Sequence, residues 1–538
     1  MLKALFRRIT DTVFRRESDA NLVGRLEREN LEAQARCDAI YISNKETPFL
    51  SLPIEIISSI FCEAHSTTGV SREGNHIRVH LIEVVISHVC RQWRSTAIGL
   101  PILWSSFCYH GRSGTYPTLR RFEIYLQRSK ENTLELGLDF RKPIRNPELN
   151  SAVLDMALAV VSRWRLVSIF SDGGSCNPTS TPEILRIKLK NLHAPHLEHL
   201  ALFPNLFFET LEDLASLSNR IGPHVFTEGA PMLKSVWLNM SAHYLYLPPL
   251  SGVTTLRIES FVQSTYSVVF PLDMLRTILT LPYLENLSMF EAFCDTDVAL
   301  ERIPLITMDR LKHLRLRDSD AVFRFLGIVR APLLESIMCE QAIISVGCNH
   351  AQGDTYSFPS LTSLVIFDAT VKSLDCLRNF MEMTSAVRHV TILHSRDSEA
   401  MDGILGKMCG PADQIPFWPH LETLTINVKE GGTAVKKAFS VFLKHHQRQG
   451  ADLTLRISDT DAMIWKETSA RHGPTMYSTV AGLCIIEEFP AKEWYDPKPW
   501  PPGGDGVLSR RIDLDHSPLD RRFPGIYHLF DIPFVVPN

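Results

Sequence analysis

The sequence predicts an α+β protein in which a small all-α module is followed by an irregular α/β solenoid. Between residues 48 and 106, apolar residues recur at helical spacing. From residue 194 onward, a short block of the form Pro-x-Leu-x-x-Leu-x-Leu returns repeatedly. Helical spacing indicates amphipathic helices, whereas a recurring leucine block indicates stacked repeats.

Composition limits the classes of partner. The chain has 538 residues, of which 45% are hydrophobic and 22% are charged, as in a folded protein. A net charge of -4 gives no reason to expect a nucleic acid or a membrane surface as the main partner. No apolar run approaches the roughly 18 residues that a membrane-spanning helix needs.

The eleven cysteines are scattered, and no two have the Cys-x-x-Cys spacing of a structural zinc site. Without a secretory leader, reduced thiols are expected, which favours the cytoplasm or the nucleus. Cys339, Cys348 and His350 come nearest to a ligand cluster, and we expect no metal there. Motifs for an activated nucleophile, a zinc hydrolase or a phosphate-binding loop are absent from the sequence, so we expect no cofactor and no enzyme.

Residues 1–47 are predicted to form a basic leader and an amphipathic helix. The first 16 residues fit a transit peptide, a membrane-surface helix or a frayed leader, although Asp11 counts against a transit peptide. Between residues 21 and 40, Leu and Ala share a helical period with charged residues. This pattern predicts a helix that packs on the following module, and the alternative is a dimeric coiled coil.

Residues 48–106 are predicted to hold three short helices. Ser51 can cap the first helix, and Pro53 suits its first turn. A second helical run covers residues 81–97, and Pro101-Ile102-Leu103-Trp104 follows it. Such short helices hold too little chain to bury all their large apolar side chains, so we expect some of these to form a partner surface.

The order Leu-Pro-x-Glu-Ile-x-x-x-Ile-Phe, Val-Cys-Arg-x-Trp-Arg and Pro-x-Leu-Trp closely resembles the F-box, the adaptor-docking motif of SCF ubiquitin ligases. The polar segment 63–80 is longer than the usual link between the first two helices, which leaves their contact open. The resemblance implies a Skp-family adaptor and, through it, a cullin as partners, with the chain a monomer within the complex. It implies that the adaptor surface is formed or supported by Leu52, Pro53, Ile56, Ile60, Phe61, Val89, Cys90, Trp93, Leu103 and Trp104.

Helices and strands alternate in residues 107–193, which we interpret as a transition region. Helices are predicted over 119–127 and 152–161, and strands over 134–138 and 164–170. The leucine blocks fill residues 194–460. Their first leucine or valine recurs about every 28 residues, at Leu197, Leu233, Val253, Leu284, Leu311, Leu334, Leu361, Val387 and Leu421.

A period of this length with Leu-x-x-Leu-x-Leu resembles the leucine-rich repeat, whose parallel strands stack side by side. The irregular spacing resembles the degenerate repeats of fungal F-box proteins of the basidiomycete type. We predict that residues 453–457 form the last strand. Residues 461–538 are predicted to form a cap and an extended Pro, Gly and aromatic tail that lies along the solenoid.

The side chains two and four residues after each anchor are expected to point to the concave face. None of these eighteen positions is acidic. Trp237, Arg257, His313 and Arg315 come from nearby blocks, and the two arginines are expected within roughly 10 Å of each other. This cluster predicts a target with an acidic or phosphorylated segment. The alternative is that these positions are solvated and that loops contact the target.

Two functions remain open on the sequence. The resemblance favours a substrate-recognition subunit, in which the F-box binds the adaptor and the repeats bind a target protein. The alternative is a protein-interaction scaffold without a role in ubiquitination, in which the F-box-like helices only cap the solenoid.

Overall fold

The computed structural model describes residues 27–38 in part, together with 52–67, 70–73, 76–79, 82–110, 119–140, 147–171, 181–204, 222–239, 242, 245–259, 269–270, 272–290, 293–294, 305–317, 326–340, 342–344, 358–393, 418–427, 433–448, 452–467, 475–490 and 500–501. The chain divides into two compact units. The first comprises residues 1–68 and 79–104, and the second comprises residues 69–78 and 105–538. No helix in the described part of the chain is long and apolar enough to cross a membrane.

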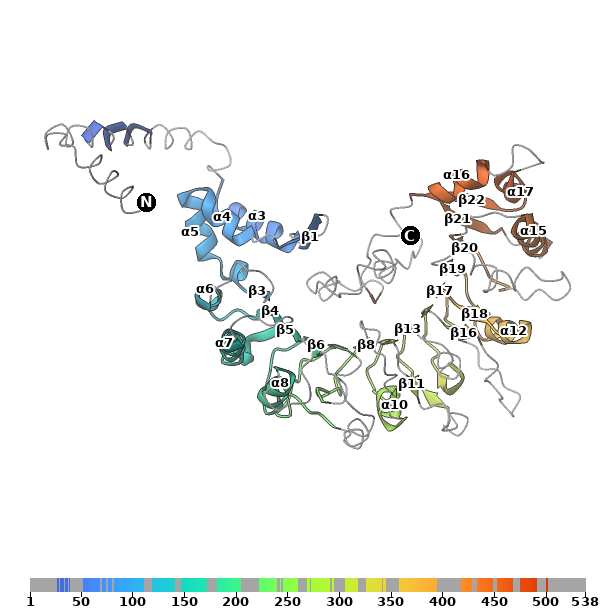
Figure 1. Cartoon of the computed structure of the whole chain (residues 1–538), viewed down its shortest axis with the longest axis horizontal. Coiled ribbons are helices and arrows are strands. Elements are labelled where there is room, and N and C mark those ends of the chain that lie inside the picture. The colour runs from blue at the N-terminus through green and yellow to red at the C-terminus, as the bar shows by residue number, and fades with distance from the viewer. Residues whose placement is uncertain are drawn as a thin grey trace, which may run out of the picture. The chain divides into compact units, whose positions relative to one another are not determined.

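One 14-stranded sheet dominates the second unit, and each strand pairs with the next one along the chain. All these pairings are parallel (Figure 1). The strands are β3 (Ser106–His110), β4 (Leu134–Phe140), β5 (Trp164–Ser171), β6 (His199–Pro204), β7 (Ser235–Leu238), β8 (Thr255–Glu259), β10 (Asn286–Phe290), β13 (His313–Arg317), β15 (Ser336–Glu340), β17 (Ser363–Phe367), β19 (His389–Leu393), β20 (Thr423–Ile426), β21 (Thr454–Ser458) and β22 (Ile485–Phe489).

This sheet makes the fold α/β, and the α+β prediction is therefore wrong. Helices α6, α7, α8, α10 and α12 lie on one side of the sheet in Figure 1, as crossover connections between parallel strands require. The described helices of this unit are α6 (Leu119–Ser129), α7 (Pro147–Leu158), α8 (Thr181–Lys190), α10 (Leu272–Leu279), α12 (Leu374–Met383), α15 (Thr433–Arg448), α16 (Asp459–Glu467) and α17 (Met476–Ala481), with the 3-10 turn η3 (Val161–Arg163).

The leucine blocks position the strands as predicted. Each of the nine predicted anchors lies two residues before a strand. Every anchor side chain is at most 1% exposed, because it packs between the sheet and the returning chain. Among the described residues that follow β8, three two-stranded sheets accompany the main one: β9 (Val269–Phe270) with β11 (Phe293–Cys294), β12 (Ile306–Thr307) with β14 (Val329–Arg330), and β16 (Ile343–Ile344) with β18 (Thr370–Val371).

The sheet extends beyond the predicted solenoid on both sides. Strands β3 to β5 belong to it, so the first helix and strand units expected within residues 107–193 join the same sheet as the leucine blocks. The strand predicted over residues 453–457 is β21, but β22 adds a further strand beyond it. None of these added strands was among the nine leucine blocks.

The first unit is helical, with α3 (Ile54–Thr67), α4 (Ile82–Val89), α5 (Arg91–Gly99) and the 3-10 turn η2 (Pro101–Trp104). The run predicted as one helix over residues 81–97 is broken at Cys90, which has extended backbone. Despite the long segment between them, α3 packs against both α4 and α5. That segment contains a two-stranded sheet of β1 (Val70–Glu73) and β2 (His76–Val79).

The described residues between 27 and 38 are helical, as predicted for an amphipathic segment. Their side chains are all exposed, and Leu31 is 69% exposed. The expectation that this helix packs on the following module is therefore wrong for these residues. Ser51, the predicted cap of the next helix, lies outside the described residues, and the Pro53 carbonyl accepts the first helical bond from Ile57 N–H at 3.1 Å.

Candidate functional site

The helical unit is held together by a small number of specific contacts. The Cys90 thiol accepts a hydrogen bond from the Trp93 backbone N–H at 3.4 Å and so caps α5. The rings of Phe61 and Trp93 meet edge to face with centroids 5.1 Å apart. The Trp104 indole donates to the Ala97 carbonyl at 2.8 Å, which fixes η2 against the end of α5.

The predicted adaptor residues divide into two groups by burial. Phe61, Leu103 and Trp104 are at most 2% exposed, so they belong to the core rather than to a leftover surface. Pro53, Ile56, Ile60 and Val89 are exposed, and Leu52, Cys90 and Trp93 are half-buried. The expectation that short helices leave large apolar residues uncovered therefore holds for Ile56, Ile60 and Val89 and fails for Phe61, Leu103 and Trp104.

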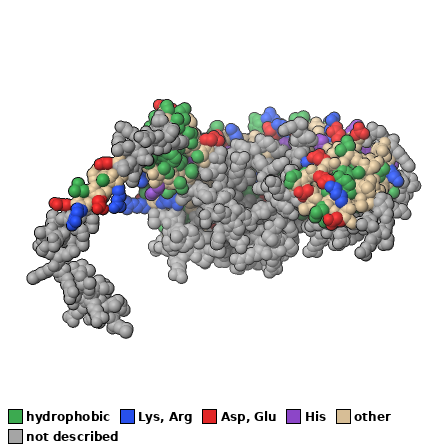
Figure 2. All heavy atoms as spheres, turned by 90° about the horizontal axis from the view of Figure 1, so that it is seen from above, with side chains coloured by type: hydrophobic (Ala, Val, Ile, Leu, Met, Phe, Trp, Pro, Cys, Tyr) green, Lys and Arg blue, Asp and Glu red, His purple; other side chains and the backbone are tan. Residues whose placement is uncertain are grey.

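Exposed aliphatic side chains are concentrated on the helical unit. Ile56 is 48% exposed, Ile60 is 39% exposed and Val89 is 56% exposed. Figure 2 shows hydrophobic side chains gathered over this unit. The other exposed aliphatic residues among the described residues of the unit were not predicted adaptor residues, and they are Leu31, Ile54, Val85, Ile98 and Ile102.

The second candidate site lies on the sheet face that carries Trp237, Arg257 and Arg315, which we call the Arg-bearing face. Trp237 pairs in register with Arg257, and Ser288 on β10 pairs with both Arg257 and Arg315. Alternate residues of a strand share a face, so these side chains form one row across four adjacent strands.

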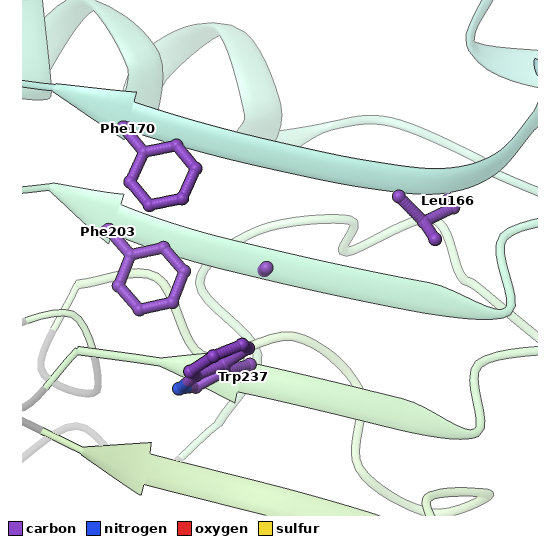
Figure 3. Packing of buried hydrophobic residues seen from close by; sticks show 5 residues of the cluster. Leu166, Phe170, Phe203 and Trp237 are labelled. Atoms are coloured by element: carbon purple, nitrogen blue, oxygen red, sulfur yellow. The ribbon is translucent and has the colours of Figure 1, made fainter. Parts of the chain in front are cut away.

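Aromatic rings extend the same face toward the start of the sheet, two residues further along their strands than the row. Phe170, Phe203 and Trp237 lie one beside the other on three adjacent strands, with Leu166 and Ala201 in the same cluster (Figure 3). The two phenylalanine rings stack with centroids 4.7 Å apart, and Trp237 meets Phe203 edge to face at 5.2 Å. The Arg257 guanidinium lies 3.5 Å from the centroid of the Trp237 ring.

A buried carboxylate joins the two arginines. Arg257 donates to both oxygens of Glu259, from Nε at 3.0 Å and from Nη2 at 2.9 Å. Arg315 donates to the same carboxylate from Nη2 and to the Ser288 hydroxyl from Nε at 3.0 Å. Ser288 in turn donates to Glu259. The prediction that the arginines lie close together is confirmed, because one carboxylate binds both.

The charge of Glu259 is stabilised by these partners. Complete burial by itself raises the pKa of this carboxyl, but the nearby guanidinium groups of Arg257 and Arg315 and the hydrogen bonds outweigh it and lower the pKa to about 2. Glu259 is therefore ionised at neutral pH. Two arginines and one glutamate give the cluster a net charge of about +1 instead of the +2 that the arginines alone would carry.

Trp500 covers the cluster from a distant part of the chain. Its ring centroid lies 4.9 Å from the Arg315 guanidinium carbon and 5.7 Å from that of Arg257. Trp500 itself is only 7% exposed. The predicted tail therefore touches the sheet at this residue, where it lies on two charged side chains.

His313 lies in the neighbouring row of the same face and does not join the cluster. Its Nδ1 is 2.7 Å from the Ser336 hydroxyl. Burial lowers the pKa of His313 below its usual value of 6.5, although Glu335 and Glu285 raise it. A second ion pair on this face joins Arg317 Nε to Glu340 at 3.3 Å, and Glu340 is fully buried.

Sequence reasoning missed Glu259 and Glu340 because it stopped four residues after each anchor. Both lie six residues after an anchor, at Val253 and Leu334. Extending the alternation by one step finds them. Their presence means that the Arg-bearing face supplies its own counterions, which weakens the argument for an acidic target.

No metal site is found in the described part of the chain, where no three His, Cys, Asp or Glu residues group together. Cys339 is buried in β15, and burial raises the pKa of its thiol to about 12. Its predicted companions Cys348 and His350 lie outside the described residues.

No protein-family model matches the sequence, and the search of curated proteins gave no match either.

Proposed function

We propose that this chain is the substrate-recognition subunit of an SCF-type ubiquitin ligase, acting in the cytoplasm or the nucleus. In this proposal the helical unit docks a Skp-family adaptor and, through it, a cullin. The observation that carries it is the exposure of Ile56, Ile60 and Val89 at positions of the F-box-like motif. The repeats then bind the target protein.

The burial pattern supports a docking surface for a physical reason. Each fully buried isoleucine contributes about 1.5 to 3 kcal/mol relative to an exposed one, so several exposed isoleucines on one small unit favour a partner that covers them. Within the motif, Phe61 and Trp104 are buried and Ile56 and Ile60 are exposed. Such a unit has its own core and still presents an apolar surface.

The Arg-bearing face is the proposed target site, with Trp237, Arg257, His313 and Arg315 as its residues. Repeat proteins commonly bind partners along one continuous strand face. An acidic or phosphorylated target stays a prediction that the net positive charge of the cluster supports and the carboxylate of Glu259 opposes.

The test is co-purification of the full chain with a Skp-family adaptor. We expect a stable complex, and we expect Ile60→Arg to weaken it at least 100-fold in Kd. Because Ile60 is 39% exposed, this substitution should leave the fold intact. Ile187→Arg is the matched control, since Ile187 lies on α8 and is 59% exposed outside the helical unit.

Two results would count against the receptor proposal. A folded full chain that elutes apart from every adaptor tested would favour the scaffold, in which the helical unit serves only the chain itself. Equal loss of binding in Ile60→Arg and Ile187→Arg would show that the contact does not use the motif.

A further inference from the structure

The two arginines of the Arg-bearing face contact two kinds of partner, which are hydrogen-bond acceptors and indole rings. Both Arg257 and Arg315 direct N–H groups to Glu259, and Arg315 also donates to Ser288. These bonds lie at the edges of the guanidinium groups. The guanidinium carbon of each arginine also lies over an indole ring, Arg257 over Trp237 and Trp500 and Arg315 over Trp500.

This division favours an aromatic ligand over an anionic one. A guanidinium binds carboxylates and phosphates through paired N–H groups at its edge, and it stacks on aromatic rings through its plane. Glu259 occupies edge positions on both arginines and is fully buried. A second carboxylate at the same edges would meet the like charge of Glu259, whereas a ring stacked on the planes meets no such repulsion.

Trp500 already provides such a ring, and it comes from the chain itself. It contacts both Arg257 and Arg315 directly.

 Trp500 follows Arg317, the last residue of β13, by 183 residues in the sequence, and the fold places it against Arg257 and Arg315. Its indole N–H is buried and has no hydrogen-bond partner among the described residues. An unsatisfied buried N–H costs about 1 to 3 kcal/mol, so this contact is one that a better-matched ligand can displace.

We propose that Arg257 and Arg315 form a receptor site for a tryptophan side chain, that Trp500 fills this site within the chain, and that a target binds by displacing Trp500 with a tryptophan of its own. This inference rests on the proposed function in one respect, which is that the ligand competing with Trp500 is a target protein. The sequence around the occupant, Pro499-Trp500-Pro501, indicates the kind of segment that fits, namely a tryptophan flanked by proline.

Trp500 is part of the chain, so its effective concentration at the site formed by Arg257 and Arg315 is high. A free peptide can therefore bind well only after Trp500 has been removed. For a short flexible connection this concentration is on the order of millimolar. A peptide that binds only weakly is therefore excluded by the intact chain and admitted once Trp500 is replaced.

The experiment measures binding of a fluorescein-labelled peptide with the sequence of residues 497–503 to the full chain. We expect Trp500→Ala to bind this peptide at least tenfold more tightly than the unmodified chain. Trp494→Ala is the matched control, because it removes a tryptophan from the same part of the sequence, and we expect it to bind like the unmodified chain. Peptides with Ala or Glu in place of the tryptophan should bind Trp500→Ala at least tenfold more weakly.

A second measurement needs no variant and protects the test against misfolding. An indole-specific reagent is applied to the unmodified chain, and labelling of Trp500 is quantified by mass spectrometry. We expect slow labelling of Trp500 that becomes at least threefold faster when an excess of the unlabelled peptide is added.

Several results would overturn the proposal. They are equal peptide binding by the unmodified chain and Trp500→Ala, no binding by a folded Trp500→Ala chain, tighter binding of the Glu-containing peptide, or labelling of Trp500 that the peptide does not change. None of these results bears on adaptor binding, so failure here is distinguishable from failure of the ubiquitin-ligase proposal.

Discussion

The Arg315 guanidinium bonds to the carboxylate of Glu259, a residue 56 positions earlier in the chain. Glu259 lies on β8 and Arg315 on β13, with β10 between them. The bond therefore spans three strands, and Ser288 on the middle strand is hydrogen-bonded to both residues. Such a network forms only when the three strands are in the correct register.

Replacing Glu259 with glutamine should destabilise the array strongly. The substitution keeps the side-chain volume and leaves two buried guanidinium groups without their carboxylate. Breaking a buried ion pair in this way costs about 3 to 5 kcal/mol. Urea unfolding of the full chain measures this loss.

The control for this prediction is Glu422→Gln. Glu422 pairs with Arg388 at 3.2 Å, but their side chains are 53% and 58% exposed. An exposed pair contributes less than about 1 kcal/mol, so this variant should unfold close to the unmodified chain. Equal stability of both glutamine variants would contradict the role assigned to Glu259.

Acid should remove the same stabilisation. The pKa of Glu259 is about 2 in the folded chain against a usual 4.5, so the unfolded chain takes up a proton before the folded chain does. This contribution, about 3 kcal/mol, is present above the usual pKa and is lost as the pH falls from about 5 toward 2. Unfolding of the unmodified chain and of Glu259→Gln is compared across this range. The variant should lose less stability on acidification, and parallel pH profiles would contradict the assignment.

The strand positions could be predicted because a local signal fixes them. A strand places alternate residues on one face, and leucines spaced for a buried face therefore reveal both the strand and its register. Leu284 and Leu311 illustrate this, since β10 and β13 begin two residues after them. The same alternation gave the positions of Arg257 and Arg315.

The partners of these arginines could not be predicted as readily. Arg315 is 1% exposed and lies 4.9 Å from the centroid of the Trp500 ring, and no sequence pattern links two residues so far apart. The break at Cys90 also escaped prediction, because the apolar spacing continues across it while the cysteine side chain caps the next helix. The fold class was wrong because the first strands, β3 to β5, lack the leucine block and so were not assigned to the same sheet.

The final prediction separates two roles within the F-box-like motif. Leu103 is fully buried, whereas Ile56 is 48% exposed. Leu103→Ala should lower the stability of the helical unit by about 2 to 5 kcal/mol, because it leaves a cavity in a packed core. Ile56→Ala should change stability by less than about 0.5 kcal/mol, because it removes side-chain atoms that already contact water.

Adaptor binding should respond in the opposite order when the two variants are compared in their folded states. Ile56→Ala should weaken binding more than Leu103→Ala does. Thermal unfolding of the full chain gives the stability of each variant, and binding is measured at a temperature at which both variants are folded. If Ile56 contacts the adaptor, Ile56→Ala weakens binding about tenfold without lowering the unfolding temperature, whereas folded Leu103→Ala binds nearly as well as the unmodified chain. The reverse result, with weak binding by folded Leu103→Ala and normal binding by Ile56→Ala, would mean that the exposed isoleucines are not the docking surface.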